Sequence, residues 1–295
     1  MSQDLPALLT PKPSGDGRWI GSPGPAMGPR LFGGQAVAQA LMAASAQESG
    51  GKLAHSLHCY FLKAGIADEP VIYDVTTLSE GRSFASRRIE ATQSDQVIFT
   101  MVASFHTPEP GFSHQEAAPL PLDFEAAQAS LKAWVAKHEQ VANSPLISRL
   151  QNRPVEVIPL DPGSLFGGRA REPHTGSWVR MRDAANAGPH MQRALLAYAS
   201  DMMLLRNAML PHGVRPGTDQ MQVASLDHAV WFHETPDFDQ WHLYATGSTW
   251  AGHARGMNHG TLFDQQGRMI ATVQQESLMR PRGETLARLQ ESETA

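Results

Sequence analysis

The sequence predicts an α+β fold made of two similar halves. Each half has one helix-forming segment followed by four strand-forming segments, and short sequence echoes recur between the halves at a nearly constant spacing. A helix followed by an antiparallel set of strands, repeated once, is an α+β arrangement. The 295 residues, 41% of them hydrophobic, are enough to form a substantial core.

The first half opens with an alanine-rich segment, residues 32–44, in which Gly33 and Gly34 come early. Alanine favours helix, and glycines at the start are compatible with a helix N-terminus. The small side chains along this helix would let a sheet wrap closely around it. The segments that follow are mostly rich in β-branched or aromatic residues, and they predict strands at residues 56–62, 71–78, 83–92 and 97–105.

A change of composition separates the two halves. Residues 107–154 carry several prolines and one helix-forming piece, residues 124–140, so we expect a crossover linker. The second half then repeats the order of the first. It has a helix-forming segment at residues 191–209 and strand-forming segments at residues 223–233, 241–249, 253–262 and 269–279.

Three local echoes indicate an internal duplication. Ser56-Leu57 recurs as Ser225-Leu226 after 169 positions, Ser86-Arg87 as Ala254-Arg255 after 168, and Thr100-Met101-Val102 as Ala271-Thr272-Val273 after 171. We therefore expect an N-terminal unit at residues 1–115, a linker at residues 116–160 and a C-terminal unit at residues 161–295.

Composition argues against several classes of protein. With 24 basic and 29 acidic residues the net charge is −5, so we do not expect a nucleic-acid binder, which needs a basic surface. The single cysteine, Cys59, rules out an internal disulfide framework and any site built from several cysteines. We expect the protein to bind no metal ion and no other cofactor.

The chain lacks an apolar run long enough to span a bilayer. Its most apolar stretch, residues 194–210, is interrupted by Asp201, Arg206 and Asn207. The first residues lack the basic and then apolar pattern of a secretory signal, and the last are not a Ser-Lys-Leu peroxisomal signal. We therefore expect a cytoplasmic protein with no membrane partner.

Asp201 is the strongest candidate for a catalytic residue. In a helix over residues 191–209, its neighbours three and four positions away would be Ala197, Tyr198, Leu204 and Leu205. Burying a carboxylate among apolar side chains costs free energy unless it has partners. Asp201 therefore either serves a site or is a structural aspartate bonded to the backbone or to an arginine.

Gln275 and Ser225 are further candidates on strands of the second half. Alternation along residues 269–279 places Gln275 on an otherwise apolar or small face, whereas Gln274 points to the opposite face. An amide on such a face needs partners, either in a site or as a cap of backbone groups. Ser225 lies near the start of its strand, where a hydroxyl alone indicates little.

The first half offers different candidates. By the repeat offset Asp201 aligns with Gly33 or Gly34 and Gln275 with Ser104, so this half has neither the carboxylate nor the amide. The backbone N–H groups at Gly33 and Gly34 would be able to polarise a carbonyl group at the helix start, unless they serve ordinary helix packing.

His58 is a weaker candidate for a substrate contact, because it lies beside the Ser56 echo. It does not pair with Cys59 as a base with its nucleophile, because adjacent strand residues point to opposite faces. The spacing of the other histidines fits no metal site. The chain also lacks a Gly-x-Ser-x-Gly nucleophile motif and a Gly-Lys-Ser/Thr phosphate loop.

Six stretches together carry a resemblance to a known family. They are residues 31–35 (Leu-Phe-Gly-Gly-Gln), 55–62 (His-Ser-Leu-His-Cys-Tyr-Phe-Leu), 71–75 (Val-Ile-Tyr-Asp-Val), 81–84 (Gly-Arg-Ser-Phe), 226–233 (Leu-Asp-His-Ala-Val-Trp-Phe-His) and 275–280 (Gln-Glu-Ser-Leu-Met-Arg). Each is modest alone, and jointly, from about Gly21 to Arg280, they resemble the acyl-CoA thioesterase II family.

The resemblance implies a double hotdog fold, in which two fused units each have a long central helix wrapped by an antiparallel sheet. It also implies hydrolysis of fatty acyl-CoA to free acid and coenzyme A and, by resemblance alone, a homo-oligomer. The family's catalytic aspartate, strand hydroxyl and glutamine fall on Asp201, Ser225 and Gln275. The family usually has threonine for Ser225 and Gln-Glu-Gly where this chain has Gln-Glu-Ser, and the neighbouring Gln274 makes the glutamine assignment depend on alternation.

The resulting hypothesis is direct attack of water on the thioester carbonyl. Asp201 would accept the proton of the water, while Ser225 and Gln275 would orient it and the amides near Gly33 and Gly34 would polarise the carbonyl. Met202, Met203 and Met209 would either line an acyl tunnel or belong to the core.

Two other functions remain open from the sequence. A hotdog acyl-CoA hydratase or dehydratase would need a histidine beside the acidic residue, and no histidine lies within a helical turn of Asp201. A non-catalytic acyl-CoA binding protein would keep the fold and bind acyl-CoA without releasing a free thiol.

Overall fold

The computed structural model describes residues 4–24, 29–48, 50–138, 155–166, 168–181, 184–214 and 220–293. The strands are β1 (Lys12–Pro13), β2 (Arg18–Gly21), β3 (Leu53–Phe61), β4 (Val71–Glu80), β5 (Phe84–Gln93), β6 (Gln96–His106), β7 (Val155–Pro159), β8 (His174–Met181), β9 (Met221–Ser225), β10 (Asp227–Phe232), β11 (His242–Gly252), β12 (Arg255–Phe263) and β13 (Met269–Pro281). The helices are α1 (Leu5–Leu9), α2 (Gly33–Ser45), α3 (Phe124–Lys137), α6 (Pro189–Ser200) and α7 (Gly283–Glu293), with 3₁₀ segments η1 (Pro162–Phe166) and η2 (Leu204–His212).

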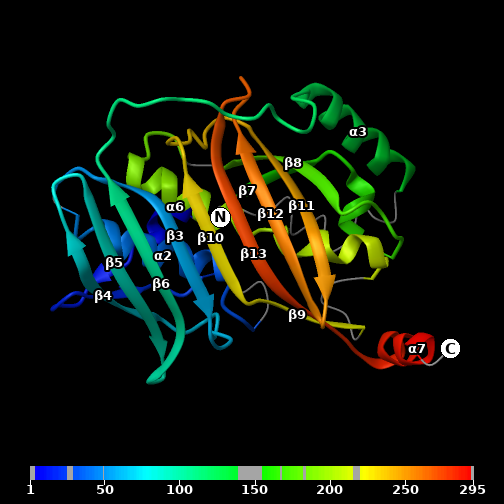
Figure 1. Cartoon of the computed structure of the whole chain (residues 1–295), viewed down its shortest axis with the longest axis horizontal. Coiled ribbons are helices and arrows are strands. Elements are labelled where there is room, and N and C mark those ends of the chain that lie inside the picture. Colours follow the sequence, from blue (N-terminus) through cyan, green and yellow to red (C-terminus); the bar gives the residue numbers. More distant parts are fainter. Residues whose placement is uncertain are drawn as a thin grey trace.

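One antiparallel sheet runs through both halves of the chain, in the order β1-β2-β4-β5-β6-β3-β10-β13-β12-β11-β8-β7, with β9 paired to β13. The halves meet where β3 pairs with β10, with Tyr60 opposite Asp227 and Ser56 opposite Trp231. In Figure 1 the sheet curves across the molecule, and α2 and α6 lie behind it. This arrangement confirms the α+β, double hotdog fold.

The two central helices pack against each other because their contact surfaces carry small groups. Almost all of α2 is buried, and seven of its thirteen residues are glycine or alanine. A Cβ atom added at Gly34 would lie 2.5 Å from the backbone oxygen of Tyr198 in α6. Glycine at this position therefore permits the backbones of α2 and α6 to approach closely.

The main hydrophobic core lies between these helices and the concave side of the sheet, and it includes residues of both halves. A second, smaller cluster joins α3 to β7 and β8, with Ala127 and Trp178 among its buried members. The segment predicted as a linker, residues 116–160, therefore contains a helix packed on the sheet and the edge strand β7. The last residues of the helix predicted at 124–140 lie outside the described residues.

The predicted helix over residues 191–209 is wrong in its second part. Helix α6 ends at Ser200, Asp201 follows as its C-terminal cap, and Met203 has a left-handed backbone with φ of 63°. A left-handed residue ends the α-helix, and the chain continues as η2. Methionine is a good helix former, so its sequence pattern does not mark this break.

The predicted strand over residues 223–233 is two strands, β9 and β10, which are separated at Leu226. The short strands β1, β2, β7 and β8 and the helices α1 and α7 were not predicted. The other predicted strands agree with the structure to within a few residues at each end.

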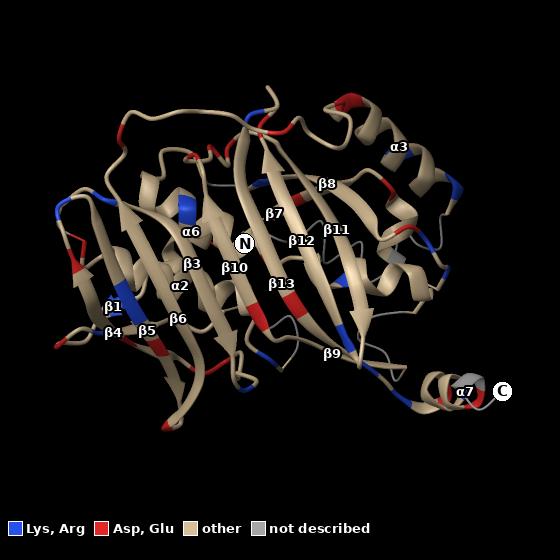
Figure 2. Cartoon of the chain, viewed as in Figure 1, with Lys and Arg blue, Asp and Glu red and all other residues tan. Residues whose placement is uncertain are grey.

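Charged residues are spread over the molecule. In the view of Figure 2, Lys and Arg segments interleave with Asp and Glu segments along strand ends and loops. Among the described helices, none has the length and apolar character needed to span a bilayer. Within the same described ranges, no group of three or more His, Cys, Asp or Glu side chains is placed to hold a metal ion.

Candidate active site

Asp201 lies where the end of α6 meets the start of α2. Its residue is only 7% exposed, and its Oδ2 atom accepts a hydrogen bond of 2.8 Å from the backbone N–H of Gly34. A carboxylate is favourable at a helix N-terminus, where N–H groups lack partners within the helix. The repeat offset aligned Asp201 with Gly33 or Gly34 as equivalent positions, but in the structure they are neighbours at opposite ends of the two helices. The offset taken from the strands does not apply to the helices, because η2 adds residues between α6 and the strands that follow.

The other carboxylate oxygen of Asp201 receives two side-chain hydrogen bonds. Gln275 Nε2 donates to Oδ1 over 2.6 Å, and Ser225 Oγ donates to the same atom over 3.3 Å. The structure thus brings together the three side chains that the sequence singled out, although they are separated by up to 74 residues along the chain. Three partners satisfy a carboxylate that would otherwise be costly to bury.

Local strand geometry places the hydroxyl and the amide. Ser225 is the last residue of β9 and lies opposite Ser277, immediately before the break at Leu226. The Asp227 side chain helps to shape this break, because its Oδ1 accepts a hydrogen bond of 2.6 Å from the N–H of Glu276. Gln275 is fully buried on the inner face of β13. Its neighbour Gln274 is exposed, as alternation predicts.

A cavity of about 350 Å³ opens beside this carboxylate. Gly33 and Ser225 both line it, and a Cβ atom added at Gly33 would lie 2.7 Å from Asp201 Oδ2. Most of the remaining lining is apolar. Arg30 and Lys63 contribute cationic side chains, and among the residues that the structure describes no acidic side chain lines the cavity. The Asp201 carboxylate therefore packs closely against Gly33, and a side chain at this position would collide with it.

The structure bears on two expectations about the first half. The N–H of Gly34 holds Asp201, so it is not free to polarise a carbonyl group. His58 is exposed, and its ring lies edge-on against Trp231 with the centroids 5.0 Å apart. Its strand neighbours Leu57 and Cys59 are buried, so His58 points away from the side of the sheet that carries the site.

The methionines after α6 do not form one tunnel. Met202 and Met203 line a cavity of only about 30 Å³, which is about the volume of one water molecule. Met209 packs instead in a buried cluster with Ala208, Met221 and Met279. Met202 and Met209 are buried core side chains, whereas Met203 is half-buried.

His228 was not predicted as a site residue, and it is 1% exposed on the inner face of β10. Its Nδ1 atom lies 3.1 Å from Gln275 Nε2, and its Nε2 atom lies 2.8 Å from Ser200 Oγ. Burial lowers the pKa of His228, and the nearby Asp201 carboxylate opposes that shift. Alternation with the buried Val230 and Phe232 was the sequence signal for its position.

Asn258 and Ser277 were also missed. The Asn258 amide donates to Ser277 Oγ over 3.2 Å and accepts from the backbone N–H of Ala208 over 3.0 Å. Ser277 Oγ in turn donates to Gln275 Oε1 over 3.4 Å. A second layer of polar side chains therefore surrounds the amide of Gln275.

Cys59 of β3 pairs with His228 of β10, and it is not a nucleophile in this arrangement. Its thiol donates to the backbone oxygen of His228 over 3.2 Å. Burial raises the pKa of the Cys59 thiol well above its usual range, and the Asp201 and Asp227 carboxylates act in the same direction. A thiol that stays protonated is a poor nucleophile.

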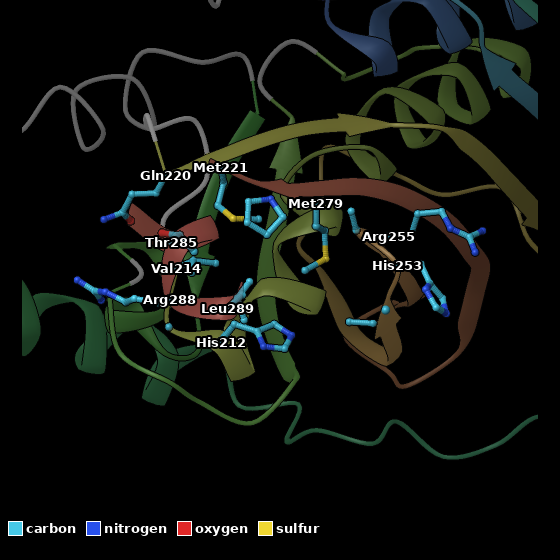
Figure 3. Close-up of a pocket in the computed structure, with 16 residues that line it drawn as sticks. His212, Val214, Gln220, Met221, His253, Arg255, Met279, Thr285, Arg288 and Leu289 are labelled. Atoms are coloured by element: carbon cyan, nitrogen blue, oxygen red, sulfur yellow. The ribbon is translucent and has the colours of Figure 1, made fainter. Parts of the chain in front are cut away.

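A larger cavity, of about 1030 Å³, lies between α7, η2 and the turn that joins β11 to β12. Figure 3 shows Met221 and Met279 inside it, with Arg288 and Leu289 of α7 on one side and His253 and Arg255 on the other. Its lining includes none of the three side chains that meet at Asp201. Of these two cavities, the smaller one at Gly33 and Ser225 adjoins the carboxylate.

Comparisons with known families match most of the chain. Residues 21–106 match the acyl-CoA thioesterase N-terminal domain family, and residues 132–278 match the acyl-CoA thioesterase family. The second match includes Asp201, Ser225 and Gln275.

Individual relatives agree with these matches. The chain is 38% identical over 255 residues to acyl-CoA thioesterase 2 of Haemophilus influenzae. This match covers 85% of this chain and 88% of the relative. It is 37% identical over 259 residues to human acyl-coenzyme A thioesterase 8, and the match covers 85% of this chain and 81% of the human protein. The crystal structure of an acyl-CoA thioesterase II, TesB2, from Mycobacterium marinum superposes with a TM-score of 0.74 at 32% identity, covering 94% of this chain and 98% of that one.

Proposed function

Because the chain belongs to the acyl-CoA thioesterase family, we propose that it hydrolyses fatty acyl-CoA by direct attack of water, with Asp201 as the general base. The observation that carries this assignment is the convergence of Ser225 Oγ and Gln275 Nε2 on Asp201 Oδ1, beside a cavity that Ser225 also lines. A general base needs a partner within hydrogen-bonding reach and a fixed orientation. The three hydrogen bonds to Asp201 supply that orientation.

The attacking water is proposed to stand beside Gly33, on the open side of Asp201 Oδ2. A Cβ atom added at Gly33 would lie 2.7 Å from Oδ2 and collide with it, so glycine keeps this side of the carboxylate free of a side chain. The water oxygen forms a bond to the thioester carbon while Asp201 accepts one of its protons. The carbon–sulfur bond then breaks, and the departing coenzyme A sulfur takes the proton from Asp201.

The substrate is proposed to enter through the cavity of about 350 Å³. Its apolar wall, which includes Phe61, Ile98 and Phe99, suits the pantetheine arm and the acyl chain. Arg30 and Lys63 in the same lining carry positive charge, which suits the phosphate groups of coenzyme A.

Hydratase or dehydratase chemistry is not favoured. His228 is the histidine near Asp201, and both of its ring nitrogens are engaged, one with Ser200 and one with Gln275. It is buried away from solvent and has no nitrogen left to protonate a substrate carbon. Incubation with an enoyl-CoA should therefore release free coenzyme A without hydration of the double bond.

Trapping of an acyl-enzyme tests direct water attack. Intact mass spectrometry of the enzyme during turnover of a saturated acyl-CoA should show no acyl adduct. Added hydroxylamine should not divert acyl groups to hydroxamate beyond the rate seen without enzyme. An adduct on Ser225, or hydroxamate formed in competition with free acid, would contradict the proposal. Binding without release of free thiol would instead show an acyl-CoA binding protein.

We further propose that the chain acts in the cytoplasm as a homo-oligomer, with units at residues 1–115 and 161–295 and the segment 116–160 between them. The outer face of the sheet carries exposed apolar side chains, among them Tyr60 at 60% and Val102 at 41% exposure. Exposed apolar groups on a sheet face are typical of interaction surfaces. Light scattering of the purified protein measures the assembly state, and a monomer at micromolar concentration would contradict this part.

A further inference from the structure

We propose that His228, in its neutral form, is a positioning residue that holds the Gln275 amide with its N–H group toward Asp201. This inference rests on the proposed function, because it concerns the residue that orients the general base. His228 does not face the cavity at Gly33 and Ser225. It acts on the general base through Gln275 alone.

The hydrogen bonds define which nitrogen of His228 carries the proton. Ser200 has one hydroxyl hydrogen, which it donates to the backbone oxygen of Ala197 over 3.0 Å. The same hydroxyl must therefore accept a hydrogen bond from His228 Nε2, which lies 2.8 Å away. His228 Nε2 consequently carries the hydrogen.

The other side of the ring requires the same tautomer. The Gln275 amide nitrogen is only a donor, so His228 Nδ1 at 3.1 Å must be the acceptor and must be unprotonated. The two partners of the ring are on different elements, α6 and β13, and they independently require a neutral ring protonated at Nε2. A protonated imidazolium would set an N–H group against the N–H group of Gln275.

The Gln275 amide is held from both ends. Its nitrogen donates one hydrogen to Asp201 Oδ1 over 2.6 Å and the other to His228 Nδ1. Its oxygen accepts from Ser277 Oγ over 3.4 Å, and Ser277 is itself held by Asn258. A flip of the amide would turn its oxygen toward the carboxylate of Asp201, so the acceptor on His228 favours the productive orientation.

The surroundings of His228 keep the ring neutral. Burial lowers its pKa, while the Asp201 carboxylate acts to raise it. The other titratable groups that face this region are the Cys59 thiol, which donates to the His228 backbone oxygen, and the Tyr244 hydroxyl, which donates to the Ser200 backbone oxygen over 2.8 Å. Burial keeps both of these groups protonated and uncharged by raising the pKa of each.

A matched pair of variants separates hydrogen bonding from space filling. In His228→Asn the side-chain oxygen reaches the position of Nδ1 and still accepts from Gln275. In His228→Gln the polar group reaches the position of Nε2, and a methylene faces Gln275. We expect kcat for acyl-CoA to fall by about 10²-fold in His228→Gln, with KM unchanged, and to stay much closer to wild type in His228→Asn.

The acid limb of the pH profile supplies a second readout. In the wild type, protonation of His228 at low pH releases Gln275 and lowers kcat. In His228→Asn this loss should move to lower pH, because asparagine does not titrate. Equal kcat values for the two variants, or an acid limb that is unchanged in His228→Asn, would overturn the inference.

Two controls keep the outcomes distinct. Asp201→Asn should be inactive under the proposed function. If Asp201→Asn is active, the proposed general base is wrong, whereas an inactive Asp201→Asn with equal histidine variants overturns the role of His228 alone. Nitrogen NMR of histidine-labelled wild-type protein does not depend on any variant folding. It should show His228 unprotonated at Nδ1 and protonated at Nε2 at neutral pH, and a protonated Nδ1 would contradict the inference.

Discussion

The backbone N–H of Gly34 donates a hydrogen bond to Asp201 Oδ2, and this contact joins the start of one central helix to the end of the other. The residues are 167 positions apart and belong to different halves of the chain. The site therefore depends on the packing of both halves. Neither half alone contains the carboxylate, its two side-chain donors and the helix N-terminus that supports it.

The two glycines at the start of α2 should have different roles, which a pair of alanine variants can separate. In Gly34→Ala the added Cβ would lie 2.5 Å from the Tyr198 backbone oxygen, so α2 and α6 must move apart. We expect the free energy of unfolding to fall by about 1–3 kcal/mol. Chemical denaturation monitored by circular dichroism measures this change, and unchanged stability would show that the helices are not in close contact.

Gly33→Ala should instead affect catalysis. Its Cβ would lie 2.7 Å from Asp201 Oδ2 and 3.0 Å from the Phe61 ring, so the carboxylate proposed to activate the water must shift. We expect kcat to fall by about 10-fold or more, with a smaller loss of stability than in Gly34→Ala. Steady-state release of free coenzyme A provides the measurement. Wild-type kcat in this variant would place the water elsewhere.

The hydroxyl of Ser225 should matter more than its size. Ser225→Ala removes the donor to Asp201 Oδ1, so we expect kcat to fall by about 10-fold to 10²-fold. Ser225→Thr keeps the hydroxyl and restricts its rotamer, so it should retain activity. If the alanine variant is as active as the threonine variant, the hydroxyl does not position the Asp201 carboxylate.

Cys59 should not react with thiol reagents in the folded protein. It is buried, its thiol is bonded to the His228 backbone oxygen, and burial raises its pKa. Titration with dithionitrobenzoate should detect no free thiol in native buffer and one after unfolding in guanidinium. Rapid reaction of the native protein would contradict the burial of this side chain. The expected lack of reaction also makes this reagent suitable for assays of coenzyme A release.

Stability should decrease as the pH falls below about 6.5, the ordinary pKa of histidine. Burial lowers the pKa of His228 and of His242 in the folded state. Below that pH the unfolded chain therefore binds protons that the folded chain does not, and each such histidine contributes a slope of up to about 1.4 kcal/mol per pH unit. Denaturation midpoints between pH 5 and pH 8 should show this trend, with a shallower slope in His228→Asn.

Much of the fold could be predicted from local patterns. The alanine-rich segment of α2 and the alternating strands β3 to β6 follow from short-range composition, and the nearly constant offset reveals the second set of strands. The short strands β1, β2 and β7 could not be predicted, because two to five residues give too little pattern. They form only through pairing with neighbours in the sheet.

Local sequence patterns predict some residues of the site, whereas others depend on contacts between distant segments. Gln275 could be separated from Gln274 by alternation alone. The position of Asp201 at a helix end could not be predicted, because Met203, whose left-handed backbone ends the helix, belongs to a residue type that favours helices. His228 was missed because its contact with Gln275 depends on the pairing of β10 with β13, which joins residues 47 positions apart.

The most direct test of the account is the turnover of Asp201→Asn with a saturated fatty acyl-CoA, followed by release of free coenzyme A. Asparagine keeps the size of the side chain and an oxygen that can accept from Gly34, so the variant should fold with a Tm close to that of the wild type. The account predicts that kcat falls by about 10²-fold to 10⁴-fold. A folded Asp201→Asn enzyme with wild-type kcat would contradict the assignment of this carboxylate as the base that activates water.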